Sequence, residues 1–141
     1  MKRLVITLIA AISAAPVFAS VTVPASDSRI TYVGRTLAEG DDVSFDWSST
    51  YVKITFQGDY LAVRASDTGK DYFNVWIDRD MSAEADKVLC LNSKDSLLVI
   101  VNSADFKKGK KQASHPAIIQ KRTEADQGKT TFHEFTTDKG L

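Results

Sequence analysis

The sequence predicts an all-β fold, an antiparallel sandwich or barrel with little helix. After Ser28, hydrophobic and polar residues alternate with a period of two over most of the chain, which is the pattern of half-buried strands. These short segments are evenly spaced and separated by turn residues, such as Gly58-Asp59 and residues 126–129. No stretch keeps a helical period of about 3.6 over three turns. Many short strands at even spacing favour one antiparallel domain.

About nine strands are expected, at residues 29–37, 43–47, 50–58, 60–66, 72–78, 88–91, 96–102, 116–122 and 130–137. Three of them carry one consistent apolar face, which predicts a core made of Val52, Ile54, Phe56, Leu61, Val63, Phe73, Val75 and Ile77. Val43, Phe45 and Trp47 form another set expected to point inward. The unbroken apolar run at 96–102 predicts a strand covered on both faces. Cys90, the only cysteine, is expected to be a small buried hydrophobic residue.

The N-terminus has the three parts of a secretory signal peptide. Lys2 and Arg3 are followed by the uncharged apolar run 4–15 and by small residues that predict cleavage after Ala19. The expected organisation is a signal peptide at 1–19, a lead-in at 20–28 and one β-sandwich domain at 29–141. The mature protein is then exported, to a periplasm or outside the cell, with no membrane segment left after cleavage.

The charge balance excludes one class of partner. The chain has 18 Lys and Arg against 18 Asp and Glu, and loss of Lys2 and Arg3 leaves a net charge of −2. A nucleic-acid partner is not expected, because binding to a phosphate backbone depends on an excess of basic side chains.

Catalytic and cofactor motifs are missing from the sequence. His115 and His133 are the only histidines, and they form no HExxH pair. There is no Gly-x-Ser-x-Gly elbow, phosphate loop or Rossmann glycine pattern. No metal or cofactor is therefore expected. His133 is interpreted as a partly exposed strand histidine, with general base as the alternative.

The strongest candidate site lies on the polar face of one expected strand. If Phe73 and Val75 face the core, the opposite face carries Tyr72, Asn74, Trp76 and Asp78. Two aromatic rings beside an amide and a carboxylate suit stacking on a sugar ring, and they equally suit a protein interface. A third possibility is that a loop or the second sheet covers this face.

A second candidate is the charged segment that contains Arg122 and Glu124. It is either an Arg/Glu network on one edge of the domain or a contact patch for another domain.

Several blocks of sequence jointly resemble a known family. They are residues 29–36, 43–48, 66–69, 72–75, 120–124 and 127–131, in this order over the whole mature chain. Together they resemble the opening of carbohydrate esterase family 2 enzymes. The resemblance implies an N-terminal β-sandwich of jelly-roll type. In that family the sandwich precedes an SGNH-type, GDSL-like hydrolase domain that removes acetyl groups from plant polysaccharides.

The sequence departs from this family at the catalytic motifs. Gly58-Asp59 is followed by Tyr60, so no Gly-Asp-Ser block occurs, and the residues three before the two histidines are Gln112 and Thr130, so no Asp-x-x-His pair occurs. No catalytic residue can be carried over, and the chain is expected not to be an enzyme by itself.

Two functions remain open. The first is an accessory domain that docks on an SGNH-type hydrolase domain, in cis or supplied by another chain. The second is a free-standing carbohydrate-binding module that uses Tyr72 and Trp76 against plant cell-wall polysaccharide.

Overall fold

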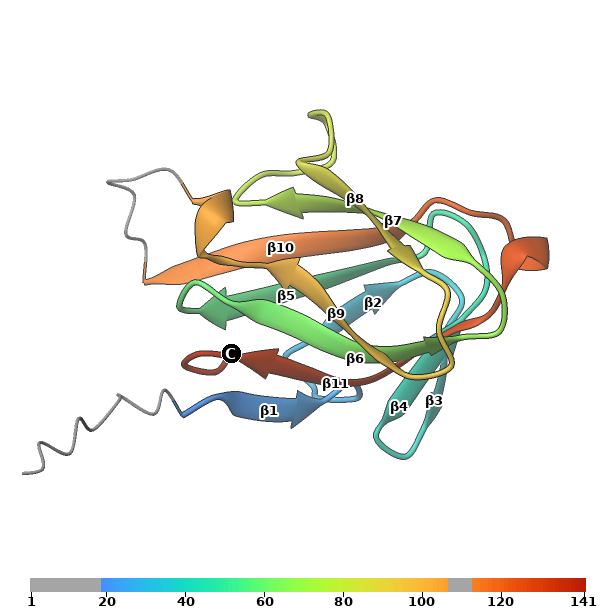
Figure 1. Ribbon diagram of the computed structural model, residues 1–141, viewed down its shortest axis with the longest axis horizontal. Coiled ribbons are helices and arrows are strands. Elements are labelled where there is room, and N and C mark those ends of the chain that lie inside the picture. Colours follow the sequence, from blue (N-terminus) through green and yellow to red (C-terminus); the bar gives the residue numbers. More distant parts are fainter. Residues whose placement is uncertain (1–18, 107–112) are drawn as a thin grey trace, which may run out of the picture.

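The computed structural model describes residues 19–106 and 113–141 and contains two antiparallel sheets that face each other (Figure 1). The predicted antiparallel β-sandwich is therefore confirmed. The expected signal peptide lies outside the described residues, apart from Ala19. Between residues 19 and 106 and from 113 onward, no helix is both long and apolar enough to cross a membrane.

The six-stranded sheet has the order β3-β4-β11-β6-β9, with β1 also paired to β11, and the five-stranded sheet has the order β2-β5-β10-β7-β8. The strands are β1 (Val21–Pro24), β2 (Thr31–Val33), β3 (Leu37–Glu39), β4 (Asp42–Phe45), β5 (Tyr51–Gln57), β6 (Leu61–Asp67), β7 (Asp71–Ile77), β8 (Lys87–Leu91), β9 (Ser96–Val101), β10 (Ser114–Lys121) and β11 (Thr130–Thr137). Two short 3-10 helices, Ser103–Asp105 and Ala125–Gln127, lie in loops.

Eleven strands appear where about nine were expected. The segment expected as one strand at 29–37 is divided into β2 and β3 at Gly34, whose φ of 124° belongs to no extended strand. β1 lies inside the expected lead-in and pairs with β11 from Val21↔Thr137 to Pro24↔Glu134. The sheet therefore extends into the segment before residue 29.

The core forms where the inner faces of the two sheets meet. Seven of the eight predicted core residues are at most 2% exposed, and Ile77, at the end of β7, is half-buried instead. Four phenylalanines join the layers: the ring of Phe132 lies 5.1 Å from Phe45, 6.0 Å from Phe73 and 5.7 Å from Phe135. Two of these contacts are edge-to-face, which is a favoured aromatic geometry.

Two predictions on the edge strands were wrong. Cys90 is exposed, because the inward side of β8 is occupied by Leu89 and Leu91 and the pleat turns Cys90 outward. β9 is covered on one face only, with Leu97 56% and Val99 37% exposed. A run of apolar residues on an edge strand thus does not require two buried faces.

Candidate functional site

One concave site of the described residues lies beside the turn between β4 and β5. Trp47 was expected to continue the inward set of β4, but β4 ends at Phe45 and the indole is 51% exposed. The chain reverses at Ser49, whose φ is 66°. The Ser49 amide donates to the carbonyl oxygen of Lys121 at 2.9 Å, which attaches this turn to the end of β10.

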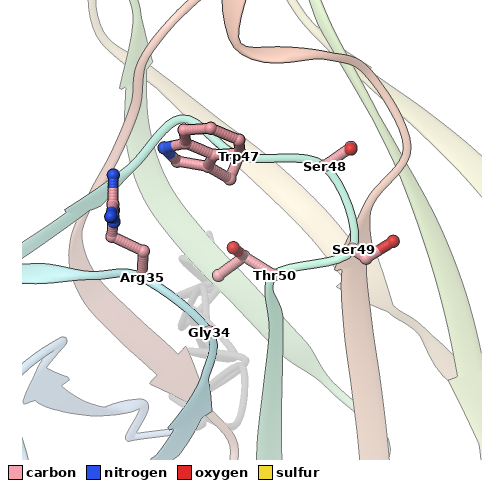
Figure 2. Close-up of a pocket in the computed structure, with 6 residues that line it drawn as sticks. All are labelled: Gly34, Arg35, Trp47, Ser48, Ser49 and Thr50. Atoms are coloured by element: carbon pink, nitrogen blue, oxygen red, sulfur yellow. The ribbon is translucent and has the colours of Figure 1, made fainter.

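The other wall of this site is the β2–β3 connection. A Cβ added at Gly34 would lie 2.7 Å from Oγ1 of Thr50, and the φ of Gly34 is also positive, so only glycine fits there. The close approach brings Arg35 to Trp47, and the guanidinium carbon lies 5.2 Å from the centre of the indole ring (Figure 2). This is a cation–π geometry.

Trp47 and Arg35 border a cleft of about 360 Å³, called the Trp47 cleft below. Its remaining lining comes from Gly34 and from the successive residues Ser48, Ser49 and Thr50, as Figure 2 shows. A second hollow of about 200 Å³ shares Arg35 and includes Leu37 and Lys129. One exposed aromatic ring, hydroxyl groups and a cation therefore meet in one surface depression. Such a combination suits a ligand with both an apolar face and polar substituents.

The predicted site residue Trp76 is buried, at 5% exposure, so its expected place on an open surface was wrong. Its indole Nε1 donates to the carbonyl oxygen of Ala83 at 2.8 Å. The connection between β7 and β8 therefore folds over the ring. The sequence interpretation in which a loop covers this face is the correct one for Trp76.

Asp78 does not share the face of Tyr72, Asn74 and Trp76. β7 ends at Ile77, and the φ of 57° at Asp78 turns the chain away. Nδ1 of His115 lies 2.8 Å from its carboxylate, and the His115 ring is buried against Phe106 at a centroid distance of 4.2 Å. Tyr72 and Asn74 remain half-buried on the outer face of the five-stranded sheet. The four residues thus do not form one patch.

Arg122 and Glu124 follow β10 and are both exposed. Glu124 lies beside the Trp47 turn, because the Ser48 hydroxyl donates to its carboxylate at 3.0 Å. Arg122 lies beside β7 instead, where its amide donates to the carbonyl oxygen of Tyr72 at 2.8 Å. The structure therefore brings Glu124, but not Arg122, to the edge of the Trp47 cleft.

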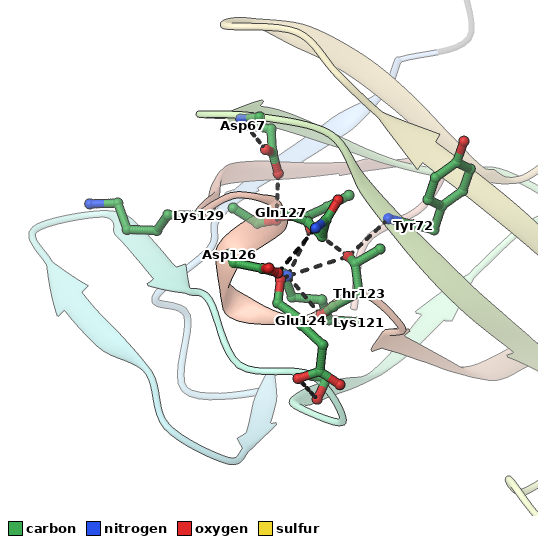
Figure 3. Close-up of polar contacts among 12 residues, drawn as sticks. Asp67, Tyr72, Lys121, Thr123, Glu124, Asp126, Gln127 and Lys129 are labelled. Atoms are coloured by element: carbon green, nitrogen blue, oxygen red, sulfur yellow. Dashed lines mark hydrogen bonds and ion pairs between the residues drawn. The ribbon is translucent and has the colours of Figure 1, made fainter.

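A buried polar cluster holds this loop in place (Figure 3). The Lys121 ammonium is fully buried and lies 2.7 Å from the carboxylate of Asp71. It also donates to the carbonyl oxygens of Thr123 at 3.0 Å and Glu124 at 3.2 Å. The sequence showed Lys121 only as a neighbour of Arg122, and nothing in its spacing to Asp71 indicates that they meet.

Asp67 lies next to this cluster. The Thr130 hydroxyl lies 2.8 Å from Asp67 and 3.1 Å from Asp71. Burial, together with the neighbouring Asp71 carboxyl, raises the pKa of Asp67 above its ordinary value. The two carboxyl groups are held by hydroxyl, amide and ammonium donors. In the part of the chain that the structure describes, no three His, Cys, Asp or Glu side chains gather as metal ligands.

The structure also assembles a Ser–His–Asp chain that the sequence did not reveal. The Oγ of Ser66 lies 3.0 Å from Nε2 of His133, and Nδ1 of His133 lies 2.9 Å from Asp42. The three residues come from neighbouring strands β6, β11 and β4. His133 is partly exposed, as expected. Separations of 67 and 91 residues leave no local motif to find.

Acyl transfer also requires hydrogen-bond donors that stabilise the oxyanion. Ser66 stands on the outer face of the sheet, whereas the backbone N–H groups of the paired residues of β6 and β11 lie in the plane of the sheet; the pairing is irregular between Phe132 and Glu134. The amides of these paired residues therefore do not point to the place where an oxyanion would form above Ser66. The hydrogen bonds of these three side chains join β6, β11 and β4.

Comparison with known families decides the identity of the domain. The family model described as "Carbohydrate esterase 2 N-terminal" matches residues 32–141. The chain belongs to this family. A search of curated proteins found no match.

Solved structures share the fold of this carbohydrate esterase 2 N-terminal domain. A family two carbohydrate esterase from Cellvibrio japonicus is similar with a TM-score of 0.69 and 19% identity, over 87% of this chain and 34% of that chain. An acetyl xylan esterase from the rumen bacterium Butyrivibrio proteoclasticus has a TM-score of 0.65 and 16% identity, over 89% and 33%. This chain thus spans 34% or less of the length of these two esterases.

A carbohydrate-binding module shares the fold over nearly its whole length. The CBM36-1 domain of a multidomain xylanase from the hindgut metagenome of Trinervitermes trinervoides has a TM-score of 0.59 and 12% identity, over 84% of this chain and 95% of that chain.

Proposed function

We propose that this chain is a non-catalytic accessory domain of an exported polysaccharide deacetylase of the acetyl-xylan type, and that it packs against an SGNH-type hydrolase domain in cis or in trans. The observation that carries the proposal is the match of residues 32–141 to the N-terminal domain of carbohydrate esterase 2. Export rests on the signal-peptide pattern of residues 1–19.

A non-catalytic role fits the chemistry of the described residues. The sequence has no Gly-Asp-Ser block, and the Ser66–His133–Asp42 chain lies on a sheet face from which the paired strand amides do not point outward. A positioned nucleophile and base give little acyl transfer when the developing charge is left unstabilised.

The outer face of the five-stranded sheet is the proposed docking surface. The strand registers align Val33, Tyr51, Gln120, Asn74 and Val88 in one row across all five strands. Val33 is 39% and Val88 47% exposed, and the three residues between them are half-buried. A row with apolar ends and amide groups in its middle can both bury surface and form hydrogen bonds with a partner.

The test is binding to an SGNH-type hydrolase domain expressed without its own N-terminal region, taken from each of the two esterases described above. We expect co-elution on gel filtration and a higher thermal midpoint of the hydrolase domain. Val88→Asp should weaken the complex at least about tenfold, because it places a charge in the interface. Leu97→Asp, at an exposed apolar site on the other sheet, is the control. Failure of the unchanged chain to bind either domain would contradict the docking role.

Carbohydrate binding is the second candidate function, and the Trp47 cleft is the observation that favours it. With Trp76 buried, Trp47 is the tryptophan available for stacking on a sugar. The ligand class would be a plant cell-wall polysaccharide such as xylan. Fluorescence titration with xylan oligosaccharides tests this role, and Trp47→Phe identifies which of the two tryptophans responds.

A further inference from the structure

The Trp47 cleft contains a cation with no carboxylate partner among the described residues. Arg29, Arg64 and Arg79 each form an ion pair with an aspartate within 4 Å, whereas the Arg35 guanidinium forms none there. Arg35 is exposed, and its guanidinium carbon lies 5.2 Å from the centre of the Trp47 indole ring. It therefore offers its planar set of N–H donors to a ligand that lies in the cleft.

Arg35 also separates two adjoining hollows. Trp47 lies in the hollow of about 360 Å³, and Lys129 lines the neighbouring one of about 200 Å³. Lys129 supplies a second cation in the neighbouring hollow. The nearby acidic groups are Asp46, in the second hollow, and Glu124, which accepts from the Ser48 hydroxyl. The arginine thus lies where an anionic substituent of a ring stacked on Trp47 would reach it.

We propose that this cleft binds a pyranose ring that bears a carboxylate, as in a uronic acid side group of a plant polysaccharide. The apolar face of the sugar stacks on the exposed indole of Trp47, and the carboxylate accepts two parallel N–H bonds from Arg35. Hydroxyl groups of Ser48 and Ser49 are the polar partners along the cleft wall. This inference rests on the carbohydrate-binding alternative of the proposed function and adds the class of sugar.

The test compares two ligands of equal length by isothermal titration calorimetry: a neutral xylo-oligosaccharide and one that carries a single glucuronic acid side group. The charged ligand should bind about tenfold more tightly, because a guanidinium–carboxylate bond is charge-assisted. Arg35→Gln should remove this advantage, so that the variant binds the two ligands with equal affinity. Raising the salt to about 0.5 M should weaken the charged ligand more than the neutral one.

Controls separate this inference from the binding function itself. Trp47→Ala should abolish binding of both ligands, and Arg122→Gln, an exposed arginine outside the cleft, should change neither. Equal affinity for the two ligands would overturn the carboxylate assignment and leave carbohydrate binding standing. Binding of neither ligand would overturn both. Unchanged binding of both ligands by the Trp47→Ala variant would show that the sugar does not bind in the Trp47 cleft. Urea midpoints and far-UV circular dichroism show that each variant is folded.

Discussion

The indole Nε1 of Trp76 donates to the carbonyl oxygen of Ala83 at 2.8 Å, and this bond closes the β7–β8 connection over a ring that the strand pattern turns away from the core. Burial of the ring leads to the first prediction. Trp76→Ala should lower the free energy of unfolding by about 3–5 kcal/mol, because it leaves a cavity and an unpaired carbonyl group. Trp47→Ala should lower it by less than about 1 kcal/mol, because the ring is half exposed. Urea denaturation measures both, and equal losses would contradict the structure.

Phe73 and Ile77 lie on the same face of β7 but differ in burial. Phe73→Ala should lower the free energy of unfolding by about 3–5 kcal/mol, since the ring is fully buried between Phe45 and Phe132. Ile77→Ala should cost clearly less, because its side chain is half-buried at the end of the strand. The comparison uses urea midpoints at a constant m-value. A larger loss at Ile77 than at Phe73 would be incompatible with the described core.

Removing one member of the buried pair of Lys121 and Asp71 should lower the free energy of unfolding more than replacing both members. Lys121→Met should lower the free energy of unfolding by about 3–5 kcal/mol, because it leaves a buried carboxylate without its cation. Adding Asp71→Asn to that variant should recover part of the loss. A double-mutant cycle measures the coupling. Purely additive losses would show that the two side chains do not interact.

The raised pKa of Asp67 makes the stability depend on pH in a defined direction. The folded chain keeps a proton on Asp67 above the ordinary value of 3.8, where the unfolded chain has released it. As the pH rises from 3.8 through the raised pKa of Asp67, this group therefore lowers the free energy of unfolding. Acidification over the same range restores the lost stability. Asp67→Asn removes the titration. Its stability relative to the unchanged chain should be higher at about pH 7 than at about pH 4. A difference that is constant over this range would contradict the assignment.

The Ser66–His133–Asp42 chain should not turn over esters. Purified protein with p-nitrophenyl acetate should match the buffer blank, because the paired backbone amides of β6 and β11 lie in the plane of the sheet and do not point to an oxyanion above Ser66. Ser66→Ala and His133→Gln should therefore leave the background rate unchanged. A rate above the blank that disappears in both variants would instead make Ser66 a nucleophile.

The alternation of apolar and polar residues was sufficient to predict most of the strands and their inward faces. Val52, Ile54 and Phe56 occupy one face of β5, because a strand places successive side chains on opposite sides. The same rule identified the core faces of β6 and β7. The blocks that resemble carbohydrate esterase family 2 also predicted the family that residues 32–141 match.

The exposure of the two tryptophans was decided by the tertiary structure alone. Alternation says which side of a strand a residue lies on, but it does not show where the strand ends or what covers its outer side. β4 ends at Phe45, which frees Trp47, and the β7–β8 connection covers Trp76. The candidate site therefore moved from one tryptophan to the other.

Contacts between distant strands were equally hidden from the sequence. Lys121 meets Asp71, and Ser66 meets His133, only because β10 pairs with β7 and β11 pairs with β6. Composition, spacing and periodicity are properties of neighbouring residues, and they determined the strands, the inward faces and the family. Strand pairing joins residues that are far apart along the chain, and it determined the Trp47 cleft, the buried ion pair and the residues aligned on the outer face of the five-stranded sheet.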